Sequence, residues 1–298
     1  MVTQVELTER IEAAYKLLEA CRVCPRECGV NRLQDDKLGF CRSGLNPVIA
    51  SVSPHHGEEP PISGTRGSGT IFFTNCNLRC EYCQNYPISQ LGHGTERTPG
   101  ELACQMLWLQ EQNCHNVNLV TPTHFVPQIL KAVGIARERG FRLPIVYNTS
   151  GYDSVETLRL LDGVVDIYMP DMRYSDDAVA LRYSVAPQYV EINRAAVREM
   201  FRQVGNLVMD EEGIARRGLL VRHLVLPNGL AGTESVMRFL AGEISPDVYL
   251  SLMSQYFPAY RAGELKQVSR RITEQEYDEA YEIKMRYGLK NGWVQELE

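Results

Sequence analysis

Short apolar runs that alternate with helical stretches constrain the fold of this chain more than any other feature. From Gly69 onward, candidate strands lie at residues 70–74, 116–121, 144–148, 165–169, 219–226 and 248–253. Helical patterns occupy the intervals, at residues 98–113, 125–139, 153–162, 186–204 and 232–242. Such alternation predicts βαβ units and a parallel sheet. Six units are two short of a closed eight-stranded barrel, so we expect an open α/β arrangement, a partial (β/α)6 barrel.

The first part of the chain has a different character and predicts a separate small module. A helical pattern at about residues 5–20 precedes a cysteine-rich stretch and a short strand at 48–52. A loop rich in proline and glycine follows, from Pro54 to Gly69. We therefore place a Cys-rich N-terminal module at residues 1–64 and the main α/β body, with a last helix near 273–287, at residues 65–298.

Composition excludes several classes of function. The 298 residues are 44% hydrophobic and 23% charged with a formal net charge of −6, which gives no basic footprint for nucleic acid. Apolar runs fall short of the ~20 residues of a membrane-spanning helix, and the N-terminus has no signal-peptide pattern. We expect a cytoplasmic protein with neither nucleic-acid nor membrane partners. Nine cysteines in that compartment indicate metal binding or chemistry more than disulfides.

Three of these cysteines form a tight group directly after the first candidate strand. Cys76, Cys80 and Cys83 have the spacing Cys-x3-Cys-x2-Cys, and Tyr82 precedes the last of them. Iron–sulfur clusters held by cysteine normally take four thiolates. Three thiolates on a four-iron cluster leave one iron open to a cofactor or substrate. The alternative is a zinc knuckle or an incidental group of buried thiols.

A second group of cysteines lies in the N-terminal module. Cys21, Cys24, Cys28 and Cys41 are separated by two, three and twelve residues. Four thiolates saturate either a tetrahedral zinc ion or an iron–sulfur cluster. Spacing does not decide between zinc and a second cluster, and a structural role is favoured over a redox role.

Two further cysteines, Cys104 and Cys114, stand apart from both groups. Each lies in an apolar context, and we expect both to be buried as small hydrophobic side chains.

Polar side chains follow every candidate strand. In parallel barrels the active site forms on the loops at the C-terminal ends of the strands. The first strand runs into the Cys76–Cys83 loop, and the others end in residues such as Thr121, Asn148, Asp171, Asn228 and Gln255. This agreement supports the barrel and predicts a site at that edge.

An arginine interrupts the apolar fifth strand. Arg222 and His223 are neighbours in the run 219–226, and strand alternation sends them to opposite faces. A buried charge needs a partner, so we expect Arg222 to hold a carboxylate of cofactor or substrate through its bidentate fork, as a catalytic residue. The alternative is an ion pair with an Asp or Glu across the barrel.

The chain resembles members of the radical S-adenosylmethionine (SAM) superfamily. The features that carry the resemblance are the cysteine loop with its Cys83-Gln84-Asn85 ending, the six strand–helix units and the Cys-rich module. Within this superfamily, the chain looks most like relatives of pyruvate formate-lyase activating enzymes. The resemblance implies a 4Fe-4S cluster on Cys76, Cys80 and Cys83 whose open iron binds SAM. It further implies reductive cleavage of SAM to a 5′-deoxyadenosyl radical that abstracts hydrogen. By the same analogy, the SAM-binding residues are Tyr82, Thr121, Thr123, Asn148, Ser150 and Asp171.

The chain also departs from that family. Relatives commonly carry a Gly-Gly-Glu motif at the second strand end, where this chain has Thr121-Pro122-Thr123-His124. Asp171-Met172-Arg173 resembles the activases' Asp-x-Lys motif, with arginine in place of lysine. A ferredoxin-like cysteine insertion after the cluster loop is lacking.

The resemblance implies partners as well. We expect a glycyl radical enzyme or other protein substrate, and an electron donor of flavodoxin or ferredoxin type. Radical modification of a small molecule or peptide is one alternative. A non-catalytic metal-binding or redox-sensing module is another.

Overall fold

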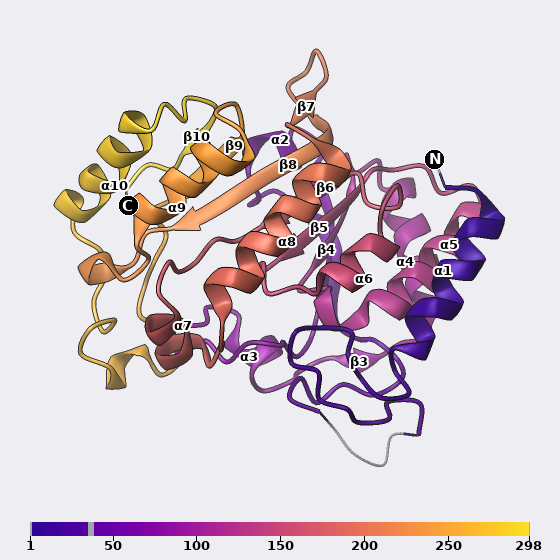
Figure 1. Ribbon diagram of the computed structural model, residues 1–298. Helices are drawn as coiled ribbons and strands as arrows, with labels where there is room; N and C mark the ends of the chain where they lie inside the picture. The colour runs from indigo at the N-terminus through magenta and orange to yellow at the C-terminus, as the bar shows by residue number, and fades with distance from the viewer. Residues whose placement is uncertain (1, 35–38, 298) are drawn as a thin grey trace.

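In the computed structural model, which describes residues 2–34 and 39–297, the strands form a ten-stranded mixed sheet (Figure 1). Its parallel strands, in spatial order, are β2 (Ser68–Phe73), β4 (Val117–Val120), β5 (Ile145–Thr149), β6 (Ile167–Pro170), β8 (Ala215–Leu224), β9 (Tyr249–Met253) and β10 (Gly292–Val294). The first six are the predicted strands, so the parallel α/β architecture is confirmed. The sequence analysis missed β10, which is too short to give an alternating pattern.

Antiparallel strands complete the sheet. β1 (Val48–His55) pairs with β2, and β3 (Thr95–Glu96) pairs with β1. β7 (Val208–Met209) forms a hairpin with the start of β8. The sheet runs from β10 at one edge to β3 at the other, which is an open arrangement.

Helices follow the parallel strands and cover one face of the sheet (Figure 1). They are α4 (Pro99–Glu111), α5 (Val126–Glu138), α6 (Val155–Leu160), α7 (Asp177–Ser184), α8 (Tyr189–Val204), α9 (Thr233–Phe239) and α10 (Glu274–Arg286). The N-terminal α1 (Gln4–Lys16) packs on α5. Short turns of helix are α2 (Pro60–Ser63), α3 (Tyr86–Ser89), η1 (Thr123–Phe125), η2 (Pro227–Gly229), η3 (Leu240–Ile244) and η4 (Ala262–Glu264). Within the described residues, each helix is too short or too polar to cross a membrane.

Local sequence signals explain where several helices begin and which face they bury. α1, α4 and α10 each start with a capping box, in which a threonine and a glutamate three residues later satisfy the first backbone N–H groups; the pairs are Thr3 with Glu6, Thr98 with Glu101, and Thr273 with Glu276. In α4 the buried positions include Leu102, Met106 and Leu109, a stripe at helical spacing.

Cys104 corrects one expectation from the sequence. It lies two residues after Leu102, on the far side of that stripe, and its side chain is exposed. The prediction that Cys104 is buried is therefore wrong, because helical geometry turns it away from the core. Cys114 is buried as predicted.

The segment before β2 covers the opposite, concave face of the sheet. Ile62 in α2 is fully buried and packs with Val146, Met169 and Leu220, which point inward from β5, β6 and β8. The side-chain amide of Asn116 donates to the Ile62 carbonyl at 2.8 Å. These contacts fix α2 and the residues just before it, Glu58 and Glu59, over the inward-facing strand residues.

The N-terminal residues share this architecture. β1 belongs to the sheet, and Leu7, Leu18 and Val23 pack into the same hydrophobic core as the main body. The boundary near residue 64 stays a prediction.

We predict that Ile62→Ala lowers the free energy of unfolding by about 2–5 kcal/mol, because it leaves a cavity between α2 and the concave face. Val5→Ala is the control, since Val5 is 70% exposed and surface changes stay within about 0.5 kcal/mol. Urea denaturation measures both. Equal midpoints for the two variants would contradict the placement of α2.

Candidate functional site: a cysteine loop over polar strand ends

The three-cysteine loop begins where β2 ends. Asn75 takes a left-handed conformation, with φ of 63°, and turns the chain out of the strand; asparagine tolerates this region better than most residues. Backbone hydrogen bonds from Arg79 to Ser184 and from Glu81 to Tyr183 pin the loop to the end of α7. The Asn77 side chain, fully buried, donates to the Tyr152 carbonyl at 2.7 Å. The loop is therefore held from several elements at once.

Each thiol of the loop has a polar neighbour. The Cys76 sulfur accepts from the Leu78 N–H at 3.3 Å, and the Cys83 sulfur lies 3.0 Å from the Ser89 hydroxyl. Burial, and then the neighbouring Cys80 thiol, raise the pKa of Cys76 to about 12. Buried thiols of this kind become thiolates only when a strong positive charge, such as a metal, binds them. Hydrogen bonds to the sulfurs also suit an iron–sulfur cluster.

A chain of hydroxyl groups connects Tyr82 to Cys80. Tyr82 is buried, its hydroxyl contacts that of Tyr174, and the Tyr174 hydroxyl lies 2.6 Å from the Ser184 hydroxyl. The Ser184 hydroxyl in turn donates to the Cys80 sulfur at 3.0 Å. Tyr82 thus supports the loop from behind, while its role toward SAM stays a prediction.

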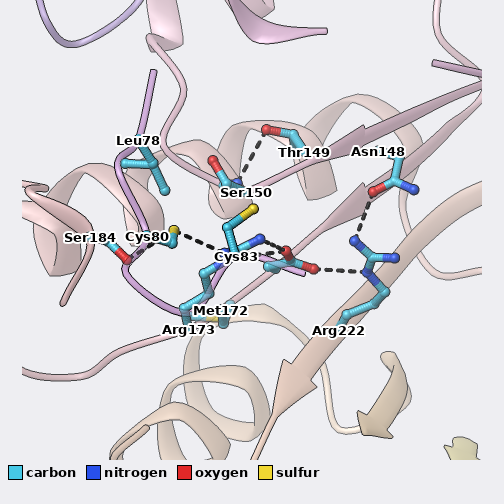
Figure 2. Close-up of polar contacts among 12 residues, drawn as sticks. Leu78, Cys80, Cys83, Asn148, Thr149, Ser150, Met172, Arg173, Ser184 and Arg222 are labelled. Atoms are coloured by element: carbon cyan, nitrogen blue, oxygen red, sulfur yellow. Dashed lines mark hydrogen bonds and ion pairs between the residues drawn. The ribbon is translucent and has the colours of Figure 1, made fainter. Parts of the chain in front are cut away.

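Asp171 forms the centre of the polar group beside the loop, between Arg173 and Arg222. Figure 2 shows these two arginines with Cys80 and Asn148. Asp171 accepts from Arg173 at 2.6 Å through one carboxylate oxygen and from Arg222 at 2.8 Å through the other. Arg173 also reaches the Cys80 sulfur at 3.3 Å, and Arg222 donates to the Asn148 side chain at 2.8 Å. Burial alone would raise the pKa of Asp171, but Arg222 and then Arg173 hold it below its ordinary value. These contacts connect the ends of β5, β6 and β8 to the Cys80 thiol.

The two neighbours in β8 face opposite sides, as alternation predicts. Arg222 lies on the concave face, whereas His223 points the other way, with its ring nitrogens near the Met172 carbonyl and the Thr233 hydroxyl. The sequence analysis gave an ion pair across the barrel as the alternative for Arg222. The ion pair that the structure shows is with Asp171, at the end of the neighbouring strand β6. A catalytic role for Arg222 stays a prediction.

The other residues expected at the site divide into two sets. Asn148 joins the group around Arg222 and Asp171, and Thr121 sits at the strand end next to it, its N–H bonded to the Asn148 carbonyl. Thr123 does not join this group. Its hydroxyl lies 3.1 Å from that of Thr149, which donates to the buried Asp153. The SAM roles of all these residues stay predictions.

Ser150 follows β5 at the same edge, and a tight turn comes after it. Its carbonyl accepts from the Tyr189 hydroxyl at 3.1 Å. Gly151 has φ of 73°, and a Cβ there would come within 2.5 Å of the Asp171 carbonyl oxygen. Asn193 bonds both the Gly151 and Asp171 carbonyls, so this turn fixes the position of Asp171.

The N-terminal cysteines lie against the same loop. Burial and the neighbouring thiols of Cys41, Cys21 and Cys28 raise the pKa of Cys24, so the four thiols share one neighbourhood. Arg26 connects this neighbourhood to the loop, donating to the Asn77 carbonyl at 2.8 Å and stacking 3.7 Å from the Phe40 ring centre.

Phe40 is a second point of contact between the two cysteine groups. Its N–H donates to the Cys28 sulfur at 3.3 Å, and its carbonyl accepts from Arg79 of the loop. The two groups of cysteines therefore lie close together in the folded chain.

In the described residues, no three His, Cys, Asp or Glu side chains converge on a single point as the ligands of one metal ion do. Cysteines that hold a four-iron cluster each bind a different iron, so they stand farther apart than the ligands of one ion. The buried thiols of the loop, with their hydrogen-bond donors, fit a cluster of that kind.

A cavity of about 160 Å³ opens between the loop and the strand ends. Its lining includes Cys83, Asp171, Arg222, Leu224 and Met253. The segment between β9 and α10 closes over it, since Gln84 donates to the Gln255 carbonyl at 2.8 Å and the Arg261 N–H to the Glu81 carbonyl. A larger cavity of about 410 Å³ lies between α9 and α10, lined by residues such as Thr233 and Ile283 and not by the cysteines. The smaller one is the candidate site because the reactive groups face it.

Sequence reasoning missed several of these residues. Tyr174, Ser184 and Ser89 contact the loop only through the folded chain, and nothing in their local sequence marks them. Arg173 was noticed only as part of a motif, although its position directly after Asp171 was a usable signal.

Comparisons with known proteins agree with this geometry. Residues 70–205 match the sequence profile of the Radical SAM superfamily. Over 290 residues the chain is 31% identical to an uncharacterized protein of Methanocaldococcus jannaschii, covering 94% of this chain and 78% of that protein.

Solved structures give the fold. HydG, a maturase of the FeFe-hydrogenase, superposes with a TM-score of 0.51 at 10% identity, covering 98% of this chain and 63% of that one. A weaker likeness is to anSMEcpe with bound AdoMet and a peptide, with a TM-score of 0.49 at 13% identity, covering 74% of this chain and 60% of that one. This chain spans less than two thirds of the length of both solved chains.

We predict that Asp171→Asn lowers the free energy of unfolding by about 3–5 kcal/mol, because two largely buried guanidinium groups lose the carboxylate that accepts hydrogen bonds from both. Glu234→Gln is the control, since Glu234 pairs with Arg286 where both side chains are more than half exposed and such pairs contribute little. Denaturant titration compares them. The wild-type advantage should fade as the pH falls below about 3.9, the ordinary pKa of Asp, toward the lower folded value. An Asp171→Asn variant as stable as wild type would remove Asp171 from the centre of the site.

Proposed function

This chain belongs to the radical SAM superfamily, and from that membership we propose that it cleaves SAM reductively and uses the radical to abstract hydrogen from a substrate. The observation that carries the proposal is the Cys76–Cys83 loop, buried at the C-terminal end of β2 beside Asp171 and its two arginines. When bound, the cluster supplies one electron that breaks a carbon–sulfur bond of SAM, giving methionine and the 5′-deoxyadenosyl group that takes the hydrogen atom.

The residues of the chain would prepare this chemistry. Cys76, Cys80 and Cys83 would hold the cluster, with Arg173 and Ser184 donating to the Cys80 sulfur. Asn148 and Asp171 lie at the strand ends where the ribose and amino acid parts of SAM would bind. The segment over the cavity would exclude water, which protects a reactive radical.

For the substrate, our first hypothesis is the glycine of a partner protein, as in glycyl radical enzyme activation. It rests on the resemblance to pyruvate formate-lyase activating enzymes and on the Asp171-Met172-Arg173 motif. A flavodoxin- or ferredoxin-type donor in the cytoplasm would supply the electron.

A second hypothesis is a small molecule or the end of a peptide. The size of the cavity favours it, because a space of about 160 Å³ lined by polar and apolar side chains suits a small group better than a protein loop. A bound glycyl loop would need the segment between β9 and α10 to move aside.

We further propose that Cys21, Cys24, Cys28 and Cys41 hold a metal, either a second iron–sulfur cluster or zinc. In the described residues these thiols do not converge on one point, so zinc would have to draw them together, whereas the ligands of a cluster stand farther apart. Three of the four thiols are buried, and the module packs directly on the cluster loop through Arg26 and Phe40. A metal bound by these four cysteines would hold the N-terminal module in its folded form, and the module in turn would support the cysteine loop that it packs on.

We predict that anaerobically reconstituted protein, reduced in the presence of SAM, releases 5′-deoxyadenosine. Cys80→Ala should abolish release, because it removes a cluster ligand. The matched control is Cys104→Ala, which changes an exposed cysteine on α4 and should keep wild-type release. Chromatography of the quenched reaction gives the yield per iron. A fully loaded wild-type cluster that releases no 5′-deoxyadenosine would refute the proposal.

A second prediction concerns the N-terminal metal. Iron and zinc contents of anaerobically purified wild type and Cys24→Ala should differ by about one zinc or about four irons, since a single cluster of this type holds four irons. Loss of zinc assigns a structural ion, and loss of iron assigns a second cluster. Identical metal contents in the two proteins would show that these cysteines hold no metal.

A further inference from the structure

A second cluster of charged and polar side chains lies on the concave face of the sheet. Glu58 and Glu59, which directly precede α2, face the guanidinium of Arg222, with oxygen–nitrogen distances of 3.7 and 3.9 Å. Both distances exceed those of a hydrogen bond. Glu59 is 3% exposed, and Glu58 is mostly buried as well. Two carboxylates are therefore enclosed near an arginine that neither one engages closely.

Charge counting shows a surplus of negative groups here. Asp171 already satisfies Arg173 and Arg222 through hydrogen bonds of 2.6 and 2.8 Å. Within the described residues, the two long contacts to Arg222 are the only ion pairs of Glu58 and Glu59. Three carboxylates thus share two guanidinium groups. A buried charge without a close partner is costly.

Several buried polar atoms of this group lack a hydrogen bond of normal geometry. One is the second carboxylate oxygen of Glu59. Asn118 is fully buried on β4, and its side chain lies close enough to the Glu58 carboxyl to lower the pKa of that group, but neither of its amide atoms makes a hydrogen bond of normal geometry. Ser251, the register neighbour of Arg222 on β9, has a buried hydroxyl that is also unpaired. Native structures leave few such atoms, so this group of donors and acceptors is suited to a ligand.

The protonation of Glu58 agrees with this. The pKa of Glu58 is raised to about 7, because burial outweighs the lowering by Arg222 and Asn118, and Glu59 and Asp171 add to the increase. On the β9 side, Tyr249 faces Glu59. Near neutral pH a proton therefore offsets part of the surplus charge. A bound cation could take the place of that proton.

We propose that Glu58 and Glu59 bind a protonated nitrogen group of the substrate, an ammonium or a guanidinium, with Asn118 and Ser251 as further partners. Such groups present several N–H donors to carboxylates. Arg222 borders both this site and the cavity below the cysteine loop. A substrate held here by its charged end would extend toward the loop. This proposal rests on the proposed function, because it names the substrate class of the same enzyme.

Binding of a simple cation tests the proposal. n-Butylammonium chloride, n-butanol and sodium butyrate, at matched ionic strength, are added to reconstituted protein with SAM, and binding is followed by saturation-transfer NMR. We expect butylammonium to bind and the neutral and anionic probes not to bind. Glu58→Gln and Glu59→Gln should each weaken butylammonium binding about tenfold or more, since each removes a charge-assisted contact. The control Glu211→Gln changes an exposed residue in the turn before β8 and should bind as wild type does.

A second measurement follows the proton. In wild type at pH 7, butylammonium should diminish the infrared band of a protonated carboxylic acid and release a proton, and Glu58→Gln should show neither change. Glu58→Gln should remain folded. Because the folded pKa of Glu58 is raised, its ionisation above the ordinary value near 4.3 costs stability, and the neutral amide avoids that cost. Iron content and thermal midpoint verify this.

Two results would overturn the inference. One is equal binding of butanol and butylammonium, and the other is wild-type affinity in folded Glu58→Gln and Glu59→Gln. Release of 5′-deoxyadenosine is measured on the same samples. Release without selective butylammonium binding contradicts this site alone, whereas selective binding without release contradicts the proposed function and leaves the site standing.

Discussion

The carboxylate of Asp171 is the contact on which the geometry of the site depends. One oxygen holds Arg173, which reaches the Cys80 sulfur, and the other holds Arg222, which reaches Asn148. A single side chain thus couples the cysteine loop to three strand ends. The backbone of Asp171 is held as well, because Asn193 donates to its carbonyl and the turn at Gly151 packs closely against that carbonyl. Preorganisation of this kind lets a site act without rearranging during the reaction.

Much of this arrangement follows from the sequence. The six strands and the helices after them were predictable, because β-rich runs and helical periodicity alternate clearly from Gly69 onward. The position of the cysteine loop at the end of β2 followed from the same pattern. The opposite faces of Arg222 and His223 followed from strand alternation.

Other features depend on contacts that no local pattern encodes. Ser184 and Tyr174 join the loop only because α7 packs beside it, and α7 itself was not predicted. Cys104 was placed in the core by its apolar neighbours, although the helical stripe turns it outward. The segment before α2 was expected only as part of a loop rich in proline and glycine. Its contact with Arg222 from the concave face became visible only once α2 was placed.

The central claim is that the cysteine loop holds a cluster with an iron open to SAM. Electron–nuclear double resonance on the reduced protein, with SAM labelled by ¹⁵N at its amino group, tests this claim most directly. Our account predicts a hyperfine coupling between the cluster spin and that nitrogen. Because Asp171 holds the polar strand ends together, the coupling should be lost in Asp171→Asn. A reduced cluster that shows no coupling to labelled SAM, at saturating SAM, would contradict the account.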